Sequence, residues 1–518
     1  MSNYKSWPFL EALKLKRNLE KNNSLSIKKI INFETGYGPS GVPHIGTFAE
    51  VLRTNMVKNA FEHLYNLETN LIAFSDDFDA LRKVPDDYPF PEKLKKELNK
   101  PLSMIPDFTE QYKSYADRNN GLLKNFLDKF GFKYNFLSST ENYKSGKFDQ
   151  QLLMILRNYE NIMNIVLPTL RKERRETYSP FLPLCQKTGV ILQVPLKILD
   201  KEKGIVAYKD SNNKYIETLV TGGNCKLQWK VDWAMRWSAL SIDYEMNGKD
   251  LIPSFELSSK IAEFIEKKIP VNMKYELFLD ENGEKISKSR GNGLSIEEWL
   301  KYGSEESLSV FMFNNPQRAK RLYFDCIPKS MDEYRSNMMK IKNNENNLVY
   351  DNPLWHIHSG DIPEHISPLD FSSLLNLVTA LNTDQKTTII EFVKIYIKDD
   401  LNIEIEKALE ESIIYALAYF KRFIFPNLNK LRPNNQQIKL IKNIILDLET
   451  HEGVPEAEDY QKIIYNRGKE IYNDNLRECF LSLYKILFGS NSGPRLGSYF
   501  YIHGLDKTLN ILKDVLKE

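Results

Sequence analysis

Residues 36–47 read Gly-Tyr-Gly-Pro-Ser-Gly-Val-Pro-His-Ile-Gly-Thr, and the architecture of the chain can be worked out from them. The preceding residues, 27–35, are apolar and rich in branched side chains, which predicts a buried parallel strand. From about His44 to Tyr65 the apolar residues recur with a helical period. The sequence therefore predicts a strand, a glycine-rich turn and a helix.

A second apolar run, Leu71-Ile72-Ala73-Phe74-Ser75, predicts the next strand and ends in Asp76-Asp77. Ligands of open α/β sheets bind beyond the carboxyl ends of the strands. Both the glycine-rich turn and the aspartate pair fall at that edge. This coincidence favours a nucleotide site.

The glycine-rich turn has a simpler interpretation, because such turns usually only reverse the chain. His44 and Thr47 favour the functional one, since residues three apart share a helix face. Backbone N–H groups at a helix start, together with the helix dipole, also bind phosphate.

A second motif, Lys285-Ile286-Ser287-Lys288-Ser289, lies far along the chain. A run of lysine and serine is usually a solvated loop. Here a predicted strand, residues 275–279, precedes it, and Gly291-Asn292-Gly293 follows it. A loop carrying two lysines can close over a triphosphate and stabilise charge as pyrophosphate leaves.

Together the two motifs resemble the signatures of class I aminoacyl-tRNA synthetases, which are written HIGH and KMSKS. The stretch from Thr221 to Trp237, with GPSGxPHIG, residues 75–85 and the lysine motif, resembles the class I lysyl-tRNA synthetases, and within them the bacterial GYGPSG-type branch. The resemblance is specific over roughly the first two thirds of the chain. It implies ATP-dependent attachment of lysine to tRNA(Lys) through lysyl-adenylate.

The resemblance also implies which residues form the site. The catalytic residues would be His44, Thr47, Lys285 and Lys288, and the amino-acid pocket would be Gly36, Asp77, Trp229 and Tyr275. ATP would contact Pro39, Ser40, Gly41, Pro43, His44, Ile45, Gly46, Thr47, Lys285, Ile286, Ser287, Lys288 and Ser289.

The tryptophans at 229, 233 and 237 recur every four residues, a stripe that is usually buried core. We expect Trp233 and Trp237 to be core and Trp229 to wall the pocket, where an aromatic ring suits the stem and ammonium of lysine. Asp232 and Arg236 are spaced for an ordinary i,i+4 ion pair.

The sequence departs from the family pattern at two positions of the site. Thr47 stands where the signature has a second histidine, and Leu251 replaces a pocket histidine that some members carry.

We expect ATP to bind as a substrate and Mg²⁺ to accompany it. We expect no structural zinc, because only Cys185 and Cys225 lie in the insertion where relatives carry cysteine pairs. The histidines 356, 358 and 365 are predicted to lie on a surface linker rather than at a metal.

Composition narrows the class of protein. A chain of 518 residues with net charge +2 suggests about three modules and no overall polycation. Four scattered cysteines fit a reducing cytoplasm. The first residues lack a secretory apolar stretch, and no window approaches a membrane span. We therefore expect a cytoplasmic protein without membrane contact.

The expected fold is α/β: a Rossmann-type parallel-sheet catalytic domain with an inserted domain, followed by an all-α C-terminal domain. The expected parts are an N-terminal helical extension (1–26), the first catalytic half (27–165), an inserted acceptor-end-binding domain (166–228), the second catalytic half with the lysine loop (229–294), a helical connector (295–345) and a helical anticodon-binding domain (346–518). The helices of the last part follow from periodicity, whereas its role follows only from the resemblance.

Two alternatives remain open. The nearer is a class I synthetase for another amino acid, such as glutamate. The farther is a nucleotidyltransferase or RNA-binding relative that no longer charges tRNA.

Overall fold

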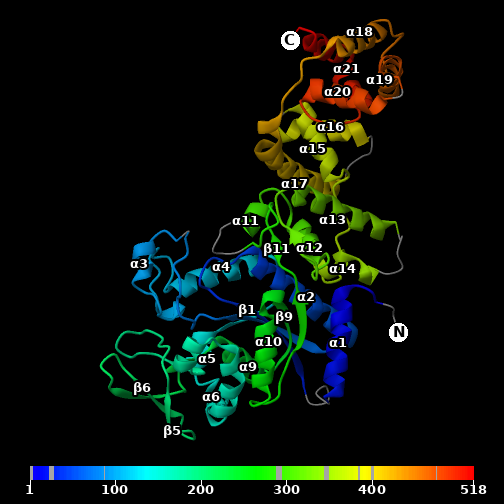
Figure 1. Cartoon of the computed structure of the whole chain (residues 1–518). Helices are drawn as coiled ribbons and strands as arrows, with labels where there is room; N and C mark the ends of the chain where they lie inside the picture. The colour runs from blue at the N-terminus through cyan, green and yellow to red at the C-terminus, as the bar shows by residue number, and fades with distance from the viewer. Residues whose placement is uncertain are drawn as a thin grey trace. The chain divides into compact units, whose positions relative to one another are not determined.

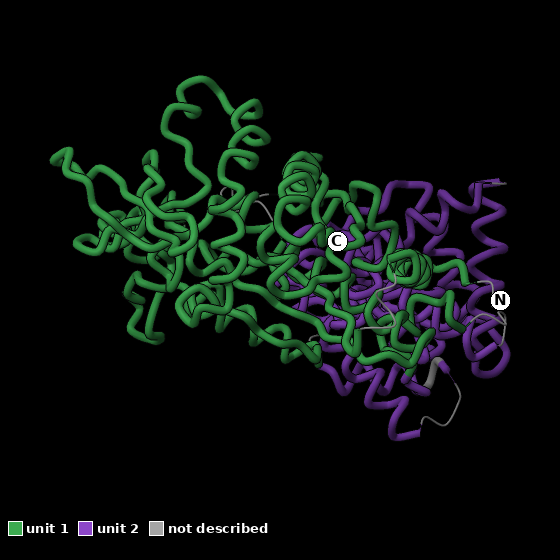
Figure 2. Tube along the Cα trace, turned by 90° about the horizontal axis from the view of Figure 1, so that it is seen from below, with its two compact units in different colours: residues 1–296, 312–323, 348–360 green, residues 297–311, 324–347, 361–518 purple. Residues whose placement is uncertain are grey.

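The computed structural model describes residues 4–22, 28–86, 88–286, 294–343, 349–382, 385–397, 402–473 and 475–517. The chain forms two compact units, which Figure 2 distinguishes by colour. The first comprises Met1–Ile296, Met312–Tyr323 and Leu348–Gly360, and the second comprises Glu297–Phe311, Phe324–Asn347 and Asp361–Glu518.

The first unit is built on a five-stranded sheet in the order β10-β9-β1-β2-β3, in which all neighbours are parallel. Its strands are β1 (Ile30–Tyr37), β2 (Glu68–Ser75), β3 (Asn135–Ser138), β9 (Ile242–Gly248) and β10 (Val271–Tyr275). The chain builds β1, β2 and β3 outward on one side and then returns to the other side of β1. The order therefore reverses between β1 and β9, which is where open α/β sheets bind ligands. The predicted Rossmann-type α/β fold is confirmed.

The predicted strand–turn–helix is present with shifted strand limits. Strand β1 pairs with β2 as far as Tyr37, opposite Ser75, so the first two residues of the glycine-rich stretch belong to the strand. Helix α2 (Ile45–Tyr65) begins directly after His44, which is its N-cap residue. It ends at Asn66, which adopts the left-handed conformation that asparagine tolerates.

Helices cover both faces of this sheet (Figure 1). Helix α1 (Trp7–Lys21) packs on α2, and Phe61 of α2 meets Phe33 of β1 edge to face. On the other face lie α9 (Trp229–Ala239) and α10 (Ile252–Ala262). Trp233 and Trp237 of α9 are buried, which confirms their assignment to the core.

The predicted ion pair between Asp232 and Arg236 is wrong. Both side chains are buried, but Arg236 pairs with Glu34 of β1 and with Asp76 after β2, each at 2.7 Å. Asp232 instead accepts a hydrogen bond from the Tyr143 hydroxyl and lies 3.7 Å from the Lys226 ammonium. Arg236 therefore pairs with carboxylates that are distant in the sequence, one inside β1 and one directly after β2, rather than with its neighbour one helical turn away.

Smaller elements complete the first unit. The short strands β4 (Phe181–Pro183) and β8 (Cys225–Leu227) pair, as do β11 (Phe278–Leu279) and β12 (Lys320–Arg321), and β5 (Lys197–Asp200), β6 (Ile205–Lys209) and β7 (Tyr215–Leu219) form an antiparallel sheet. The intervening helices are α3 (Pro91–Lys95), α4 (Tyr115–Lys129), α5 (Ser139–Lys144), α6 (Asp149–Arg157), α7 (Tyr159–Val166) and α8 (Lys172–Thr177). The single strand predicted over residues 275–279 is in fact split between β10 and β11.

The described part of the second unit is helical. Its two hydrophobic cores lie among α15–α17 and among α18–α21. The helices are α11 (Ile296–Trp299) and α12 (Glu305–Phe313) at its boundary, then α13 (Cys326–Lys342), α15 (Phe371–Leu381), α16 (Lys386–Ile397), α17 (Ile403–Tyr419), α18 (Asn435–Glu449), α19 (Ala457–Tyr472), α20 (Leu476–Phe488) and α21 (Leu496–Val515). Among the described residues, no helix is both long enough and apolar enough to cross a bilayer.

The expectation that His356 lies on a surface linker is wrong. His356 belongs to α14 (Pro353–Ile357) in the first unit, and it is buried against Phe9, Phe313 and Trp355. Its Nε2 lies 2.9 Å from the Ser6 hydroxyl. Burial lowers the pKa of His356 to about 3. A polar sequence around the helix concealed an aromatic cluster that ties α14 to the N-terminal segment.

Candidate active site

The glycine-rich turn is held in shape by hydrogen bonds from the last residue of β1 and from two residues of α4. Three consecutive carbonyl groups of the turn accept hydrogen bonds from side chains, and two of these side chains belong to α4. The bonds run from the Tyr37 hydroxyl to the Gly41 carbonyl (2.7 Å), from the Tyr115 hydroxyl to the Ser40 carbonyl (2.9 Å) and from the Asn119 amide to the Pro39 carbonyl (2.8 Å). The turn therefore has a defined geometry before any ligand binds.

His44 is placed by the helix that it begins. Its Nδ1 accepts a hydrogen bond from the Thr47 backbone N–H at 3.2 Å. Because Nδ1 is an acceptor, the neutral ring carries its proton on Nε2. The imidazole thus presents a donor beside the positive end of the α2 dipole, an arrangement that suits an anionic oxygen.

Gly46 makes room for this ring. A Cβ atom at position 46 would lie 2.7 Å from His44 Cε1 and 2.9 Å from Nδ1. Heavy atoms do not approach so closely, so any larger residue must displace the imidazole.

If His44 takes part in the reaction at this site as the sequence predicts, Gly46→Ala should lower the rate about 10- to 100-fold, because a displacement of about 1 Å at a reacting group has effects of that size. The measurement is ATP–pyrophosphate exchange with a parallel thermal melt. In a His44→Ala background the same substitution should have little further effect. An equal loss in both backgrounds would mean that Gly46 acts through something other than the ring.

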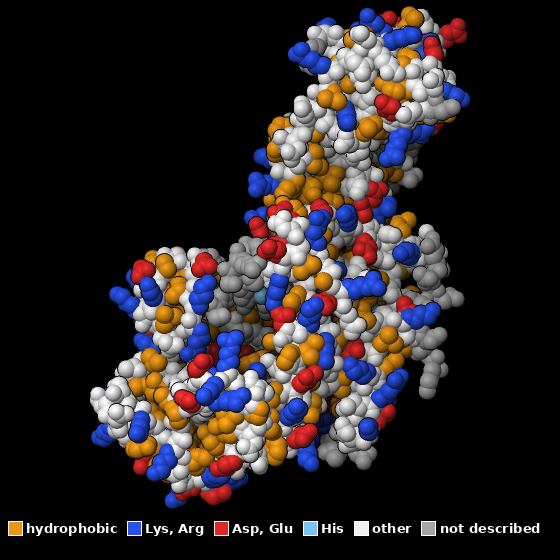
Figure 3. Space-filling view, in the orientation of Figure 1, with side chains coloured by type: hydrophobic (Ala, Val, Ile, Leu, Met, Phe, Trp, Pro, Cys, Tyr) orange, Lys and Arg blue, Asp and Glu red, His pale blue; other side chains and the backbone are white. Residues whose placement is uncertain are grey.

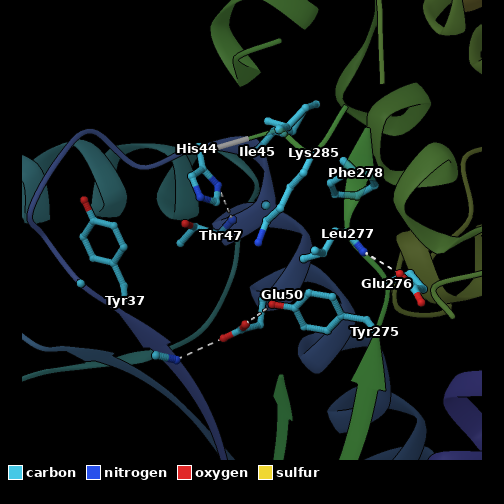
Figure 4. A pocket seen from close by; sticks show the side chains of 14 residues that line it. Tyr37, His44, Ile45, Thr47, Glu50, Tyr275, Glu276, Leu277, Phe278 and Lys285 are labelled. Carbon is cyan, nitrogen blue, oxygen red and sulfur yellow. Dashed lines mark hydrogen bonds between the residues drawn. The ribbon is translucent and has the colours of Figure 1, made fainter. Parts of the chain in front are cut away.

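The two motifs line one cavity of about 350 Å³ at the carboxyl ends of β1 and β10 (Figure 4). The Lys285 side chain extends into it, and its amine lies between Thr47 on one side and Leu277 and Tyr275 on the other. The Lys285 ammonium pairs with the Asp250 carboxylate. The lining residues are Gly36, Tyr37, Gly38, His44, Ile45, Gly46, Thr47, Glu50, Tyr275, Glu276, Leu277, Phe278, Lys285 and Ile286.

Several predicted site residues do not line this cavity within the described part of the chain. Pro39, Ser40, Gly41 and Pro43 shape the turn beside it, whereas Ser287, Lys288 and Ser289 lie outside the described residues.

Trp229 and Asp77 also stay predictions as amino-acid-binding residues. Trp229 is 36% exposed at the start of α9 and stacks on Trp233, with ring centroids 4.7 Å apart. Asp77 accepts hydrogen bonds from the Ser138 hydroxyl (2.5 Å) and the Thr140 N–H (2.7 Å), so its contacts secure the start of α5.

Glu50 is a cavity residue that the sequence reasoning missed. Its carboxylate accepts hydrogen bonds from the Gly36 N–H at 3.2 Å and from the Tyr275 hydroxyl at 2.5 Å (Figure 4). Removal from water raises the pKa of Glu50 to about 7, and the two hydrogen bonds oppose that rise. A carboxylate held in this way favours a cationic ligand group. The available signal was an acidic residue inside a mainly apolar helical segment.

The parallel sheet, its reversal point and one cavity lined by a helix-capping histidine and a loop lysine are typical of α/β enzymes that bind a nucleotide. A family model described as "tRNA synthetases class I (K)" matches residues 5–361. The chain belongs to this family, and it is an aminoacyl-tRNA ligase.

Named relatives are similar over nearly the whole chain. A "Lysine--tRNA ligase" from Rickettsia africae (strain ESF-5) is 45% identical over 513 residues, covering 99% of this chain and 98% of the relative. Another, from Rickettsia bellii (strain RML369-C), is 45% identical over 517 residues with the same coverage. A crystal structure of a glutamate tRNA ligase from Elizabethkingia meningosepticum matches at 11% identity and a TM-score of 0.40, covering 95% of this chain and 99% of that one.

Proposed function

We propose that this protein attaches lysine to tRNA(Lys) in two steps, through a lysyl-adenylate. The observation that carries the proposal is the shared cavity, in which His44 and Lys285 face a pocket that ends at the Glu50 carboxylate. Cationic and N–H donors suit the phosphates of ATP, and the carboxylate suits the ammonium of lysine.

In the first step, a carboxylate oxygen of lysine forms a bond to the α-phosphorus of ATP as the bond to the bridging oxygen of pyrophosphate breaks. His44 Nε2–H and the N–H groups at the start of α2 bind phosphate oxygens. Lys285 leaves Asp250 and, with Lys288, stabilises the charge that develops on pyrophosphate. Thr47 supplies a hydroxyl on the same helix face as His44.

In the second step, the 2′-hydroxyl of the terminal tRNA adenosine attacks the lysyl carbonyl and AMP leaves. No protein group becomes covalently attached in this scheme. The chain's contribution is positioning and charge stabilisation, which can account for most of the barrier reduction in such reactions.

In this proposal, the residues at the Glu50 end of the cavity select lysine over other amino acids. The ammonium of the side chain binds against the hydrogen-bonded pair of Glu50 and Tyr275, with Gly36 bordering its path. Trp229 and Asp77 complete the pocket in this proposal. A glutamate side chain would instead bring its carboxylate toward Glu50 and Glu276, both of which line the cavity. Like charges at that distance oppose binding, so glutamate is disfavoured.

Mg²⁺ would enter with ATP, held mainly by phosphate oxygens and water, as this ion usually is. Among the described residues, no three histidine, cysteine or carboxylate side chains cluster in a way that could hold a metal. The absence of a structural zinc stays a prediction from the cysteine count.

For the remaining parts we retain the boundaries given by the sequence. Residues 166–228 would bind the acceptor end, and residues 346–518 would read the anticodon. All four cysteines are free, which supports a cytoplasmic site of action. Figure 3 shows lysine and arginine side chains interspersed with acidic ones over the face in view. A contact surface for tRNA phosphates would draw on such exposed cations.

We expect Glu50→Gln to lower kcat/KM for lysine about 100-fold, because the substrate ammonium loses its buried counter-charge. The measurement is aminoacylation of tRNA with a panel that includes lysine and glutamate. The matched control is Glu62→Gln, which alters a carboxylate of the same helix that pairs with Lys58 outside the cavity. Charging with glutamate rather than lysine by the unaltered protein would overturn the proposal.

A further inference from the structure

Arg53 is a buried cation next to the amino-acid pocket but not part of its lining. It lies on α2 three residues after Glu50, so the two side chains leave the same helix face. Arg53 is 1% exposed. Charged side chains are rarely buried to this degree unless they are paired.

The contacts of Arg53 are unusual for a buried guanidinium. Its Nε donates to the Met312 carbonyl at 2.9 Å, and its Nη1 has no hydrogen-bond partner among the described residues. The guanidinium carbon lies 5.6 Å from the ring centroid of Tyr275 and 5.5 Å from that of Phe278. Within the described part of the chain, its contacts are the Met312 carbonyl and the two aromatic rings, and no carboxylate forms an ion pair with it.

Glu50, which is reached across the Tyr275 ring, is the carboxylate whose charge acts on Arg53. Burial lowers the pKa of Arg53 to about 10, and the electrostatic influence of Tyr275 and Glu50 opposes that change. A cation over the face of a phenol ring also makes its hydroxyl a better donor. In this structure that hydroxyl donates to Glu50.

We propose that Arg53 is a positioning residue for lysine recognition. Arg53 lies behind the Tyr275 ring and keeps the Glu50 carboxylate ionised. It also keeps the Tyr275 hydroxyl directed at Glu50 before the substrate ammonium binds. This inference rests on the proposed function, since it assigns to Glu50 the binding of that ammonium.

Other charged groups also act on Glu50, and each belongs to a different element. The negative charges of Glu34 in β1 and Glu245 in β9 raise the pKa of Glu50, whereas the positive charge of Arg236 in α9 lowers it. His44, Glu276 and Lys285 border the same cavity. Arg53 is distinguished among the cations by its place on the same helix and its contact with the hydrogen-bonding partner of Glu50.

The test is the pH dependence of lysine activation by the full-length protein in the presence of tRNA, between pH 6 and 8.5. In the unaltered protein, kcat/KM for lysine should rise as Glu50 ionises. In Arg53→Met the midpoint should move to higher pH by about one unit, because loss of a nearby cation raises the pKa of a carboxyl. At pH 7 the KM for lysine should rise about 5-fold while kcat changes little, and the difference should narrow toward pH 8.5.

Three further variants separate this role from simple support of the fold. Arg53→Gln removes the charge but can still donate to the Met312 carbonyl, so it should shift the midpoint in the same direction even if Arg53→Met folds poorly. Arg53→Lys keeps the charge and should restore the midpoint. Lys58→Met removes another buried cation of α2, paired with Glu62, and should leave the midpoint in place.

The outcomes for the two proposals are distinguishable. In a Glu50→Gln background, Arg53→Met should no longer shift any midpoint. A pH-independent loss of activity in Arg53→Met and Arg53→Gln, or an equal effect in the Glu50→Gln background, would overturn the role of Arg53 alone. Full lysine activity in Glu50→Gln itself would instead overturn the proposed lysine pocket.

Discussion

His44→Ala should lower the rate of lysyl-adenylate formation by about 10²–10³-fold, which is the usual loss when one donor to a developing negative charge is removed. The ring nitrogen that faces away from Thr47 carries the proton in the neutral form. Alanine removes this donor and leaves only backbone N–H groups at the start of α2. The measurement is ATP–pyrophosphate exchange with saturating tRNA and lysine.

The same substitution also removes the cap of α2, so stability must be measured separately. An N-cap side chain contributes about 1 kcal/mol. His44→Asn is the matched control, because asparagine is among the best N-cap residues but cannot supply the imidazole. We expect His44→Asn to unfold like the unaltered protein and still to be nearly inactive. Recovery of exchange in His44→Asn would show that His44 acts only as a cap.

Arg236→Met should destabilise the first unit by about 3–5 kcal/mol, because removing one partner of a buried ion pair leaves uncompensated charge. Arg236 lies 2.7 Å from both Glu34 and Asp76, and Glu34 is fully buried. The urea concentration at the unfolding midpoint measures the loss. Arg157→Met, which breaks an exposed pair with Glu202, should change that midpoint little.

The loss in Arg236→Met should depend on pH in a defined direction. Burial already raises the pKa of Asp76 and of Glu245 to about 7, and Arg236 opposes that rise. Without the arginine these acids hold their protons to still higher pH in the folded state. An acid with a raised folded pKa destabilises the protein progressively as pH rises from its unfolded pKa, about 4, to its folded pKa. The stability difference should therefore be smaller at pH 5.5 than at pH 8, and a difference that grows on acidification would contradict this account.

The sequence predicts the catalytic framework well because local rules determine it. A branched apolar run, a glycine-rich turn and a periodic helix specify β1, the turn and α2, and the structure matches the predicted helix limits to within one residue. The membership in the class I lysyl family, predicted from two motifs and the tryptophan segment, is confirmed by the family match and the named relatives. That His44 and Lys285 face one cavity agrees with the motif prediction, while the roles of these residues stay proposals.

What the sequence does not reveal depends on pairing between distant segments. The i,i+4 spacing predicted an ion pair between Arg236 and Asp232. In the structure, Arg236 instead pairs with Glu34 of β1 and with Asp76, which follows β2. Glu50 and Arg53 looked like ordinary helix residues until Tyr275, more than 200 positions later, was placed beside them. His356 was misjudged for the same reason, because its aromatic neighbours come from three separate stretches of chain. Hydrophobic periodicity indicates the type and the buried face of a single helix or strand. It carries no information about partners from distant segments.

The strand order has a consequence for how the protein is made. Strand β1 gains β2 as a neighbour almost at once, but β9, its partner on the other side, emerges from the ribosome roughly 200 residues later. At the usual synthesis rate of 5–20 residues per second, that interval lasts roughly 10–40 s. Throughout it, the nascent chain carries an open strand edge, which is a template for wrong pairing. We therefore expect neighbouring nascent chains on one mRNA to need chaperones, or a wide distance between ribosomes, to keep their open β1 edges from pairing with each other. The finished enzyme has no such need, because β9 covers that edge.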